Sequence, residues 1–300
     1  MISFCYWSYW YLIVLPWGWL TKPTLVGVLN FVGLHISFSL LCYSYYKSIH
    51  TDPGVAPKGW VPPGLQEEQL ETLKQMEVPR DALLDIEHFY IPKWCRHCQS
   101  WKPPRAHHCK DKQSCVLKMD HYCPWVYNAV GYRNHKFFIL FLFYASISLI
   151  YFLICCITRV VLVLSNYSRA TSFTLPEVIG LMIQLFLTLP VTIGIFSLFC
   201  YQISCLAGNV TSIETYSQKK YKKGAKKRNL EFKWFYDYGF FHNMKEVMGH
   251  SFLQWFVPVM PEHIRKGDGV TYRTRLYTVT EVGTDKPDPE PLVEGLTKRK

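Results

Sequence analysis

The sequence predicts an all-α integral membrane protein with four transmembrane helices and a cytosolic, zinc-binding, cysteine-rich module that contains short β-hairpins. Three observations predict this fold: long stretches without charge, basic residues gathered in two of the other segments, and a cluster of cysteines and histidines. Hydrophobic residues make up 49% of the 300 residues, and charged residues only 18%. Long uncharged apolar stretches in such a chain are typical of segments buried in lipid.

The expected membrane helices are the stretches that contain no Asp, Glu, Lys or Arg. Each is close to the ~20 residues that cross a bilayer as a helix. The first is rich in Trp and Tyr at both ends, as interfacial segments are, and it lacks the basic start and the cleavage site of a signal peptide. The stretches are Ile2–Leu20, Leu25–Tyr46, Phe137–Thr158 and Val178–Leu206.

The basic residues predict the orientation. Residues 47–136 carry thirteen Lys and Arg, and residues 207–300 carry seventeen. Because basic loops remain in the cytosol, we expect both segments there, flanking the transmembrane pairs 1–46 and 137–206, with both termini cytosolic. The net charge of +11 then reflects loops beside an anionic lipid bilayer, and no nucleic-acid partner is expected.

Two stretches of the C-terminal tail are unusual in composition. Seven of the ten residues in Lys219–Arg228 are basic, which fits either a solvated face or contact with anionic headgroups. Residues 232–258 contain too many aromatic residues for an exposed loop, so we expect them to pack on the module or to lie in the membrane interface. No internal repeat is evident along the chain.

Cysteines and histidines of the module, about residues 94–134, have the spacing of a metal site. Cys95 and Cys98 can place two thiolates on one metal, and His108 and Cys115 can complete a tetrahedron. The alternative is that these cysteines are buried by chance. The module has few aliphatic residues for a core, so we expect one structural zinc ion to stabilise it.

A second group of reactive side chains follows the metal-type cluster. Asp120, His121 and Cys123 supply a thiol, an imidazole and a carboxylate, which are the parts of a nucleophile, its base and the group that orients the base. The same spacing is also compatible with half of a metal site, so the residues by themselves leave both interpretations open.

At these residues the chain resembles the DHHC family of protein S-acyltransferases. The resemblance covers about residues 1–260. Within the module it is carried by Cys95-x-x-Cys98, Lys102-Pro103-Pro104-Arg105-Ala106-His107-His108-Cys109, Asp120-His121-Tyr122-Cys123-Pro124-Trp125, Asn128, Val130-Gly131, Asn134 and Phe137. Outside the module it is carried by Asp52-Pro53-Gly54, by Thr211-Ser212-Ile213-Glu214, and by Asn243–Trp255, which resembles the family's C-terminal palmitoyltransferase motif.

The resemblance implies a two-step acyl transfer. Cys123 takes a long-chain acyl group from an acyl-CoA, with palmitoyl-CoA as the expected donor, and passes it to a cysteine of a protein substrate. The family's roles carry over to His121 as the base and to Asp120 as its orienting group. Protein substrates with cysteines near the membrane, and an endoplasmic reticulum or Golgi location, are likewise implied by the resemblance.

Donor binding is also assigned by the resemblance. Lys102, Arg105 and His107 match basic residues that meet the CoA phosphates in this family, although solvated surface charge is the simpler interpretation of such residues. Trp125 matches a residue that lines the acyl cavity.

The chain departs from the family pattern at one group of positions. The four-residue motif ends Tyr122-Cys123, where the family has His-Cys. The family's second zinc site would use Cys109, Lys112, Tyr122 and Ala129, of which only Cys109 can bind metal. We therefore expect one zinc ion in place of two, with the proposed catalytic residues retained.

Two other functions compete with the acyltransferase. A catalytically inactive, zinc-stabilised scaffold would not need Asp120, His121 and Cys123 together. A channel or transporter usually carries charged residues in its spans, and these stretches carry none. Hydroxylamine-sensitive acyl label on the purified protein separates the first function from the other two.

Overall fold

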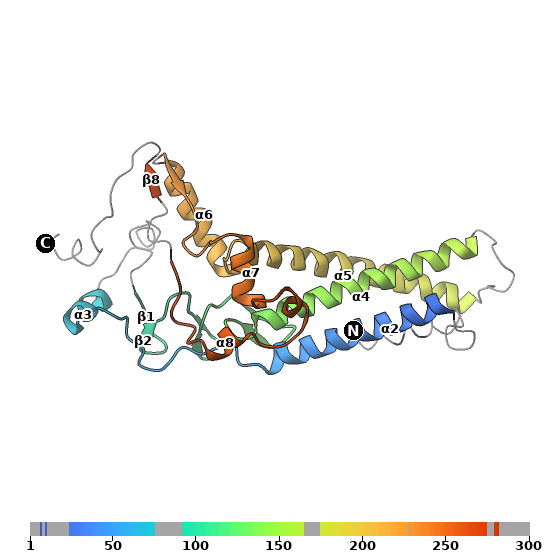
Figure 1. Ribbon diagram of the computed structural model, residues 1–300, viewed down its shortest axis with the longest axis horizontal. Helices are drawn as coiled ribbons and strands as arrows, with labels where there is room; N and C mark the ends of the chain where they lie inside the picture. The colour runs from blue at the N-terminus through green and yellow to red at the C-terminus, as the bar shows by residue number, and fades with distance from the viewer. Residues whose placement is uncertain are drawn as a thin grey trace. The chain divides into compact units, whose positions relative to one another are not determined.

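The computed structural model forms two compact units (Figure 1). The residues that it describes are Trp7, Trp10, 24–75, 92–164, 175–227, 229–274 and 279–281. The unit called here the helical unit consists of Met1–Ser48, Lys136–Ile203 and Phe256–Val259. The unit called here the hairpin unit consists of Ile49–His135, Ser204–Trp255 and Met260–Lys300.

Three long helices supply most of the helical unit: α2 (Leu25–His50), α4 (His135–Leu164) and α5 (Leu175–Ala207). In the part of the chain that the structure describes, three helices are long and apolar enough to cross a membrane, and they lie at Leu25–His50, His135–Val161 and Val178–Ala207. These ranges match the last three stretches predicted from the absence of charge.

The first predicted span, Ile2–Leu20, lies outside the described residues except for Trp7 and Trp10. Trp10 makes edge-to-face ring contacts with Phe31 at 5.7 Å and with His35 at 5.9 Å, both on α2. It belongs to an apolar cluster whose buried members come from α4 and α5, namely Phe152, Cys155, Cys156 and Leu181.

The hairpin unit contains short, separate antiparallel hairpins, which confirms the predicted β-hairpins of the module. Each hairpin joins two three-residue strands through a four-residue turn. The pairs are β1 (Lys93–Cys95) with β2 (Ser100–Lys102), β3 (His107–Cys109) with β4 (Ser114–Val116), and β5 (His121–Cys123) with β6 (Asn128–Val130).

These hairpins repeat every 14 residues. The first strand of each ends on a cysteine, at Cys95, Cys109 and Cys123. The last residue of each turn has a left-handed backbone, with φ near 49°, 49° and 48° at Gln99, Gln113 and Tyr127. The expectation of no internal repeat is therefore wrong. The sequence carries only a short trace of the repeat, namely the 14-residue spacing of the three cysteines and the Gln99-Ser100 and Gln113-Ser114 pairs.

The remaining elements precede or follow these hairpins in the sequence. They are α3 (Glu67–Gln75), α6 (Ser212–Lys227), β7 (Leu230–Phe232) paired with β8 (Val279–Glu281), α7 (Phe240–Met248), a 3₁₀ helix (Phe252–Phe256) and α8 (Glu262–Lys266).

Half of the aromatic tail packs as predicted. Trp234, Phe235 and Tyr236 are buried in one cluster with Tyr221 of α6. The Arg105 guanidinium of the module lies 4.2 Å from the centre of the Tyr236 ring, so this part of the tail contacts the module. Of the later aromatic side chains in the same stretch, Trp255 is buried, whereas Phe241 and Phe252 are exposed by 70% and 64%.

Candidate active site and metal centre

The four predicted metal ligands come together in the first two hairpins. The β3–β4 register places His108 directly opposite Cys115, and the first hairpin turn carries Cys95 and Cys98 to them. The ligand atoms of these four residues all lie within 4.8 Å of one another. Within the described ranges, this is the one group of three or more His, Cys, Asp or Glu residues close enough to share a metal ion.

The spacing of the donor atoms fits zinc. The Cys115 and Cys98 sulfurs lie 3.7 Å apart. His108 Nδ1 lies 3.2 Å from the Cys98 sulfur and 3.7 Å from the Cys95 sulfur. Ligands about 2.3 Å from a tetrahedral zinc ion stand roughly 3.8 Å from each other, so these separations are of the size that a zinc ion requires.

The predicted catalytic residues also meet, on the first strand of the third hairpin. His121 Nδ1 lies 2.6 Å from Asp120 Oδ2. Asp120 is fully buried, and both of its oxygens accept further hydrogen bonds from Ser212: Oδ1 from the backbone N–H at 2.6 Å and Oδ2 from the hydroxyl at 2.9 Å. The carboxylate is therefore fixed from two sides.

The electrostatics of the pair favour a thiolate and an imidazolium. Burial lowers the pKa of His121, but hydrogen bonds to Asp120 and Cys123 outweigh burial and raise that pKa to about 9. Burial raises the pKa of the Cys123 thiol, yet the hydrogen bond with His121, together with the backbone N–H groups of Val126 and Trp125, holds it below its ordinary value. A thiolate is the nucleophilic form of cysteine.

The backbone of the third hairpin turn bonds the Cys123 sulfur in the same way as the backbone of the first hairpin turn bonds the Cys95 sulfur. The backbone N–H groups of His97 and Cys98 bond the Cys95 sulfur, and those of Trp125 and Val126 bond the Cys123 sulfur. Hydrogen bonds to the charged form of a group stabilise that form. The same backbone arrangement therefore favours the thiolate form of Cys95, a candidate metal ligand, in the first hairpin and of Cys123 in the third.

Tyr122 packs in the region where the family's second zinc site would be. It lies opposite Ala129 in the β5–β6 register. Its ring and the aliphatic side chain of Ile213 from α6 pack against a buried cluster formed by Cys109, Val116, Met119 and Ala129. Side-chain packing thus surrounds Cys109, the one residue of the family's second zinc site that could still bind metal.

The basic residues that resemblance assigned to CoA are in different environments. Lys102 and His107 are partly exposed, whereas the Arg105 side chain is only 1% exposed. Arg105 makes a two-pronged ion pair with Glu214, from Nε at 2.7 Å and from Nη2 at 2.6 Å. A phosphate contact by Arg105 would therefore require this internal pair to open.

Two functional candidates were not found from the sequence. Lys93 is exposed and lies directly opposite Lys102 in the β1–β2 register. Like charges directly opposite each other destabilise a hairpin, and an anion between them would relieve the repulsion.

Ser212 was noted only as part of a motif, and its contact with Asp120 joins residues 92 positions apart. No local sequence signal reports such a contact.

Trp125 projects from the turn of the third hairpin and is 78% exposed. Its backbone N–H bonds the Cys123 sulfur, and its exposed ring is an apolar surface on the same turn.

The fold and the site together define a class: proteins with apolar helices long enough to cross a membrane and a module of Cys/His hairpins that could hold a metal ion. Residues 88–219 match the family profile described as "DHHC palmitoyltransferase". The chain is 32% identical to palmitoyltransferase ZDHHC20-B of Danio rerio, over 88% of this chain and 78% of that protein.

Similar proteins occur in plants and mammals. The chain is 32% identical to probable protein S-acyltransferase 14 of Arabidopsis thaliana, over 78% of this chain and 73% of that protein. It is 31% identical to palmitoyltransferase ZDHHC2 of Mus musculus, over 83% of this chain and 67% of that protein. The chain belongs to the DHHC palmitoyltransferase family.

Proposed function

We propose that this protein is a palmitoyltransferase that moves a long-chain fatty acyl group, palmitoyl, from acyl-CoA to cysteines of protein substrates through an acyl-enzyme at Cys123. Family membership supports the reaction class. The observation that carries the assignment of the residues is the hydrogen-bonded series Ser212–Asp120–His121–Cys123, which ends on a thiol with a lowered pKa.

In the first step, the Cys123 thiolate attacks the thioester carbonyl of the acyl-CoA. The bond between the acyl carbon and the Cys123 sulfur forms, the bond to the CoA sulfur breaks, and the departing CoA thiolate takes the proton held by the His121 imidazolium. Asp120 keeps Nδ1 of His121 engaged, so that the other ring nitrogen faces the reacting sulfur atoms.

In the second step, a substrate cysteine gives its proton to the neutral His121 and attacks the acyl group on Cys123. The new thioester forms on the substrate, and Cys123 leaves as a thiolate. The imidazolium–thiolate pair is restored, so the enzyme needs no redox partner and no external proton donor.

The CoA phosphates and the acyl chain of the donor require different binding surfaces. Lys102, with Lys93 opposite it, supplies positive charge for the phosphates of CoA. Burial, together with the neighbouring cations, lowers the pKa of His107 to about 4, so at pH 7 its imidazole is neutral and offers a hydrogen bond but no charge. Lys and Arg attract phosphate strongly, and exposed lysines can do so as flexible point charges. The exposed ring of Trp125 offers an apolar surface for the start of the acyl chain.

We further propose that the metal of the Cys95, Cys98, His108 and Cys115 site is a single structural zinc ion. It would tie the first hairpin turn to the second hairpin and supply folding energy without touching the reaction. The resemblance also supports four spans with cytosolic termini, protein substrates with cysteines near the membrane, and an endoplasmic reticulum or Golgi location.

Acylation of Cys123 tests the proposed function. Purified protein incubated with labelled palmitoyl-CoA should gain label that neutral hydroxylamine removes, because thioesters are cleaved by it. Cys123→Ala should remove this label. Cys109→Ala is the matched control, since Cys109 occupies the equivalent position of the second hairpin. Full labelling of Cys123→Ala would reject the mechanism.

Metal content tests the zinc assignment. Elemental analysis should give about one zinc per chain, and Cys98→Ser should lose it together with resistance to proteolysis of the hairpins. Cys109→Ser should keep its zinc. A value near two, with metal on Cys109, would show that the second site is occupied.

A further inference from the structure

The turn between α5 and α6 is built around the side chain of Asn209. Asn209 is 4% exposed, and its backbone is left-handed with φ of 45°. Its Oδ1 accepts a hydrogen bond from Arg105 Nη1 at 3.0 Å. Its Nδ2 donates to the Tyr236 carbonyl at 2.8 Å and to Glu246 Oε2 at 2.6 Å. Its carbonyl accepts from Arg105 Nη2 at 2.9 Å and from Trp234 Nε1 at 3.1 Å.

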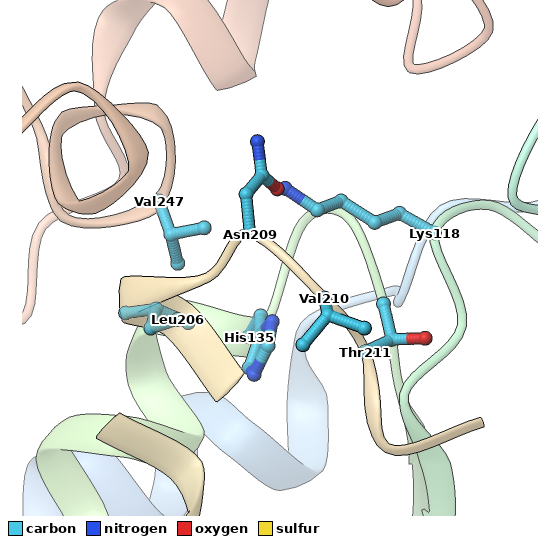
Figure 2. Close-up of a pocket in the computed structure, with 7 residues that line it drawn as sticks. All are labelled: Lys118, His135, Leu206, Asn209, Val210, Thr211 and Val247. Carbon is cyan, nitrogen blue, oxygen red and sulfur yellow. The ribbon is translucent and has the colours of Figure 1, made fainter. Parts of the chain in front are cut away.

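Asn209 thereby joins two ion pairs. Arg105 and Glu214 pair at 2.6 Å, with side chains 1% and 9% exposed. Lys118 and Glu246 lie 3.8 Å apart, with side chains 7% and 28% exposed. Figure 2 shows Lys118 and Asn209 extending toward each other along the same pocket. The amide can serve both pairs because it both accepts and donates, and the two cations balance the two carboxylates.

The same turn determines where α6 begins. Thr211 and Glu214 form a capping box: Thr211 N–H donates to Glu214 Oε2 at 2.9 Å, and Glu214 N–H donates to Thr211 Oγ1 at 3.2 Å. The next residue, Ser212, donates its N–H to Asp120. Glu214 thus serves the helix cap and the Arg105 pair together, and both depend on the turn held by Asn209.

We propose that Asn209 is a positioning residue for the acyl transfer: its side chain fixes the first turn of α6 so that Ser212 holds Asp120, and Asp120 in turn holds His121 against Cys123. This inference rests on the proposed function. Asn209 touches none of the reacting atoms, and its action passes through Ser212.

Removal of the side chain should displace the turn without unfolding it. Arg105 would keep its bond to Glu214 but lose its amide partner, and Glu246 would lose its shortest contact with the turn. Because hydrogen bonds weaken steeply with distance and angle, a small shift of Ser212 is enough to loosen Asp120. Displacements of about 1 Å at supporting residues can cost large factors in rate.

Asn209→Gly is the appropriate test variant, because glycine keeps the left-handed backbone and removes only the side chain. The rate of iodoacetamide alkylation of Cys123 is measured from pH 5 to 9, with the modified peptide identified by mass spectrometry. The parent should react with an apparent pKa below that of an ordinary thiol, about 8.5. In Asn209→Gly the midpoint should rise toward that value, with alkylation at pH 7 slowed about three- to tenfold. Glu246→Gln, which keeps the size of the side chain but weakens its bond to Asn209, should shift it in the same direction by less.

Trp255→Phe is the matched control, because it removes a different buried hydrogen bond of the hairpin unit, from Trp255 Nε1 to the Gly249 carbonyl. The pH profile of Cys123 alkylation in Trp255→Phe should be the same as in the parent protein. The inference is overturned if the Asn209→Gly profile also overlays the parent's, or if Trp255→Phe moves it equally. If Asn209→Gly does not fold, Glu246→Gln decides by the same criteria. An ordinary pKa for Cys123 in the parent would instead count against the proposed function itself.

Discussion

His121→Ala is expected to slow acylation of Cys123 by about 10²–10⁴-fold, the usual range for loss of a general acid–base group. In the proposed mechanism the imidazole both keeps Cys123 deprotonated and protonates the departing CoA sulfur, so its loss should affect both halves of the step. The measurement is the initial rate of hydroxylamine-sensitive labelling from palmitoyl-CoA at pH 7.

The same mechanism also predicts how the acylation rate changes with pH. In the parent, acylation should rise with pH as Cys123 loses its proton, below the range of an ordinary thiol, and should fall above the His121 pKa of about 9, where the imidazolium is lost. In His121→Ala the fall should disappear. The rise should move to higher pH, because burial then acts on the Cys123 thiol without its principal opposing hydrogen bond.

Tyr122→Phe is the control for this prediction. It alters the neighbouring residue but keeps the ring that packs near Cys109. Most of the acylation rate should remain, because a phenol with an ordinary pKa of about 10 is a poor base at neutral pH. A larger loss in Tyr122→Phe than in His121→Ala would reverse the assignment of the base.

Arg105→Met is expected to destabilise the hairpin unit by about 3–5 kcal/mol, the cost of leaving one partner of a buried ion pair uncompensated. Glu214 is 9% exposed and would remain without the two-pronged pair, and the guanidinium's contacts with Asn209 and Tyr236 would also be lost. Unfolding in detergent, followed by the intrinsic tryptophan fluorescence of the protein, should move to lower temperature by roughly 10 °C.

The double variant Arg105→Met, Glu214→Gln distinguishes a lost ion pair from a lost packing contact. It removes the unpaired charge but keeps an acceptor for the Thr211 N–H, so it should recover part of the stability. Arg96→Met is the matched control, since Arg96 is exposed in the first hairpin turn. An Arg105→Met protein as stable as Arg96→Met would mean that the pair contributes little.

Arg105 shows what the sequence could and could not tell. The motif around it predicted a basic residue facing CoA, because sequence reveals charge but not the direction of a side chain. The structure turns the guanidinium inward to Glu214, which lies 109 residues away in the chain. A cation and its anion at that separation leave no local pattern, so only the folded chain could join them.

Local sequence signals were enough to predict the three long apolar helices and the Cys-x-x-Cys pair. Lipid solvates each helix separately, so an uncharged stretch of sufficient length is a local signal, and three of the four predicted spans correspond to described helices. The Cys-x-x-Cys spacing is equally local, because a single turn brings both thiols to one point.

The contacts that position the reactive residues could be seen only in the folded chain. It revealed the 14-residue hairpin repeat, packed the Tyr122 ring against the cluster around Cys109, and brought Asn209 and Ser212 of the α5–α6 turn to the ion pairs and to Asp120. The contacts of Asn209 with Arg105 and of Ser212 with Asp120 join residues 104 and 92 positions apart. The physical reason is that buried polar groups require partners but specify only the chemistry of the partner, not its position in the chain.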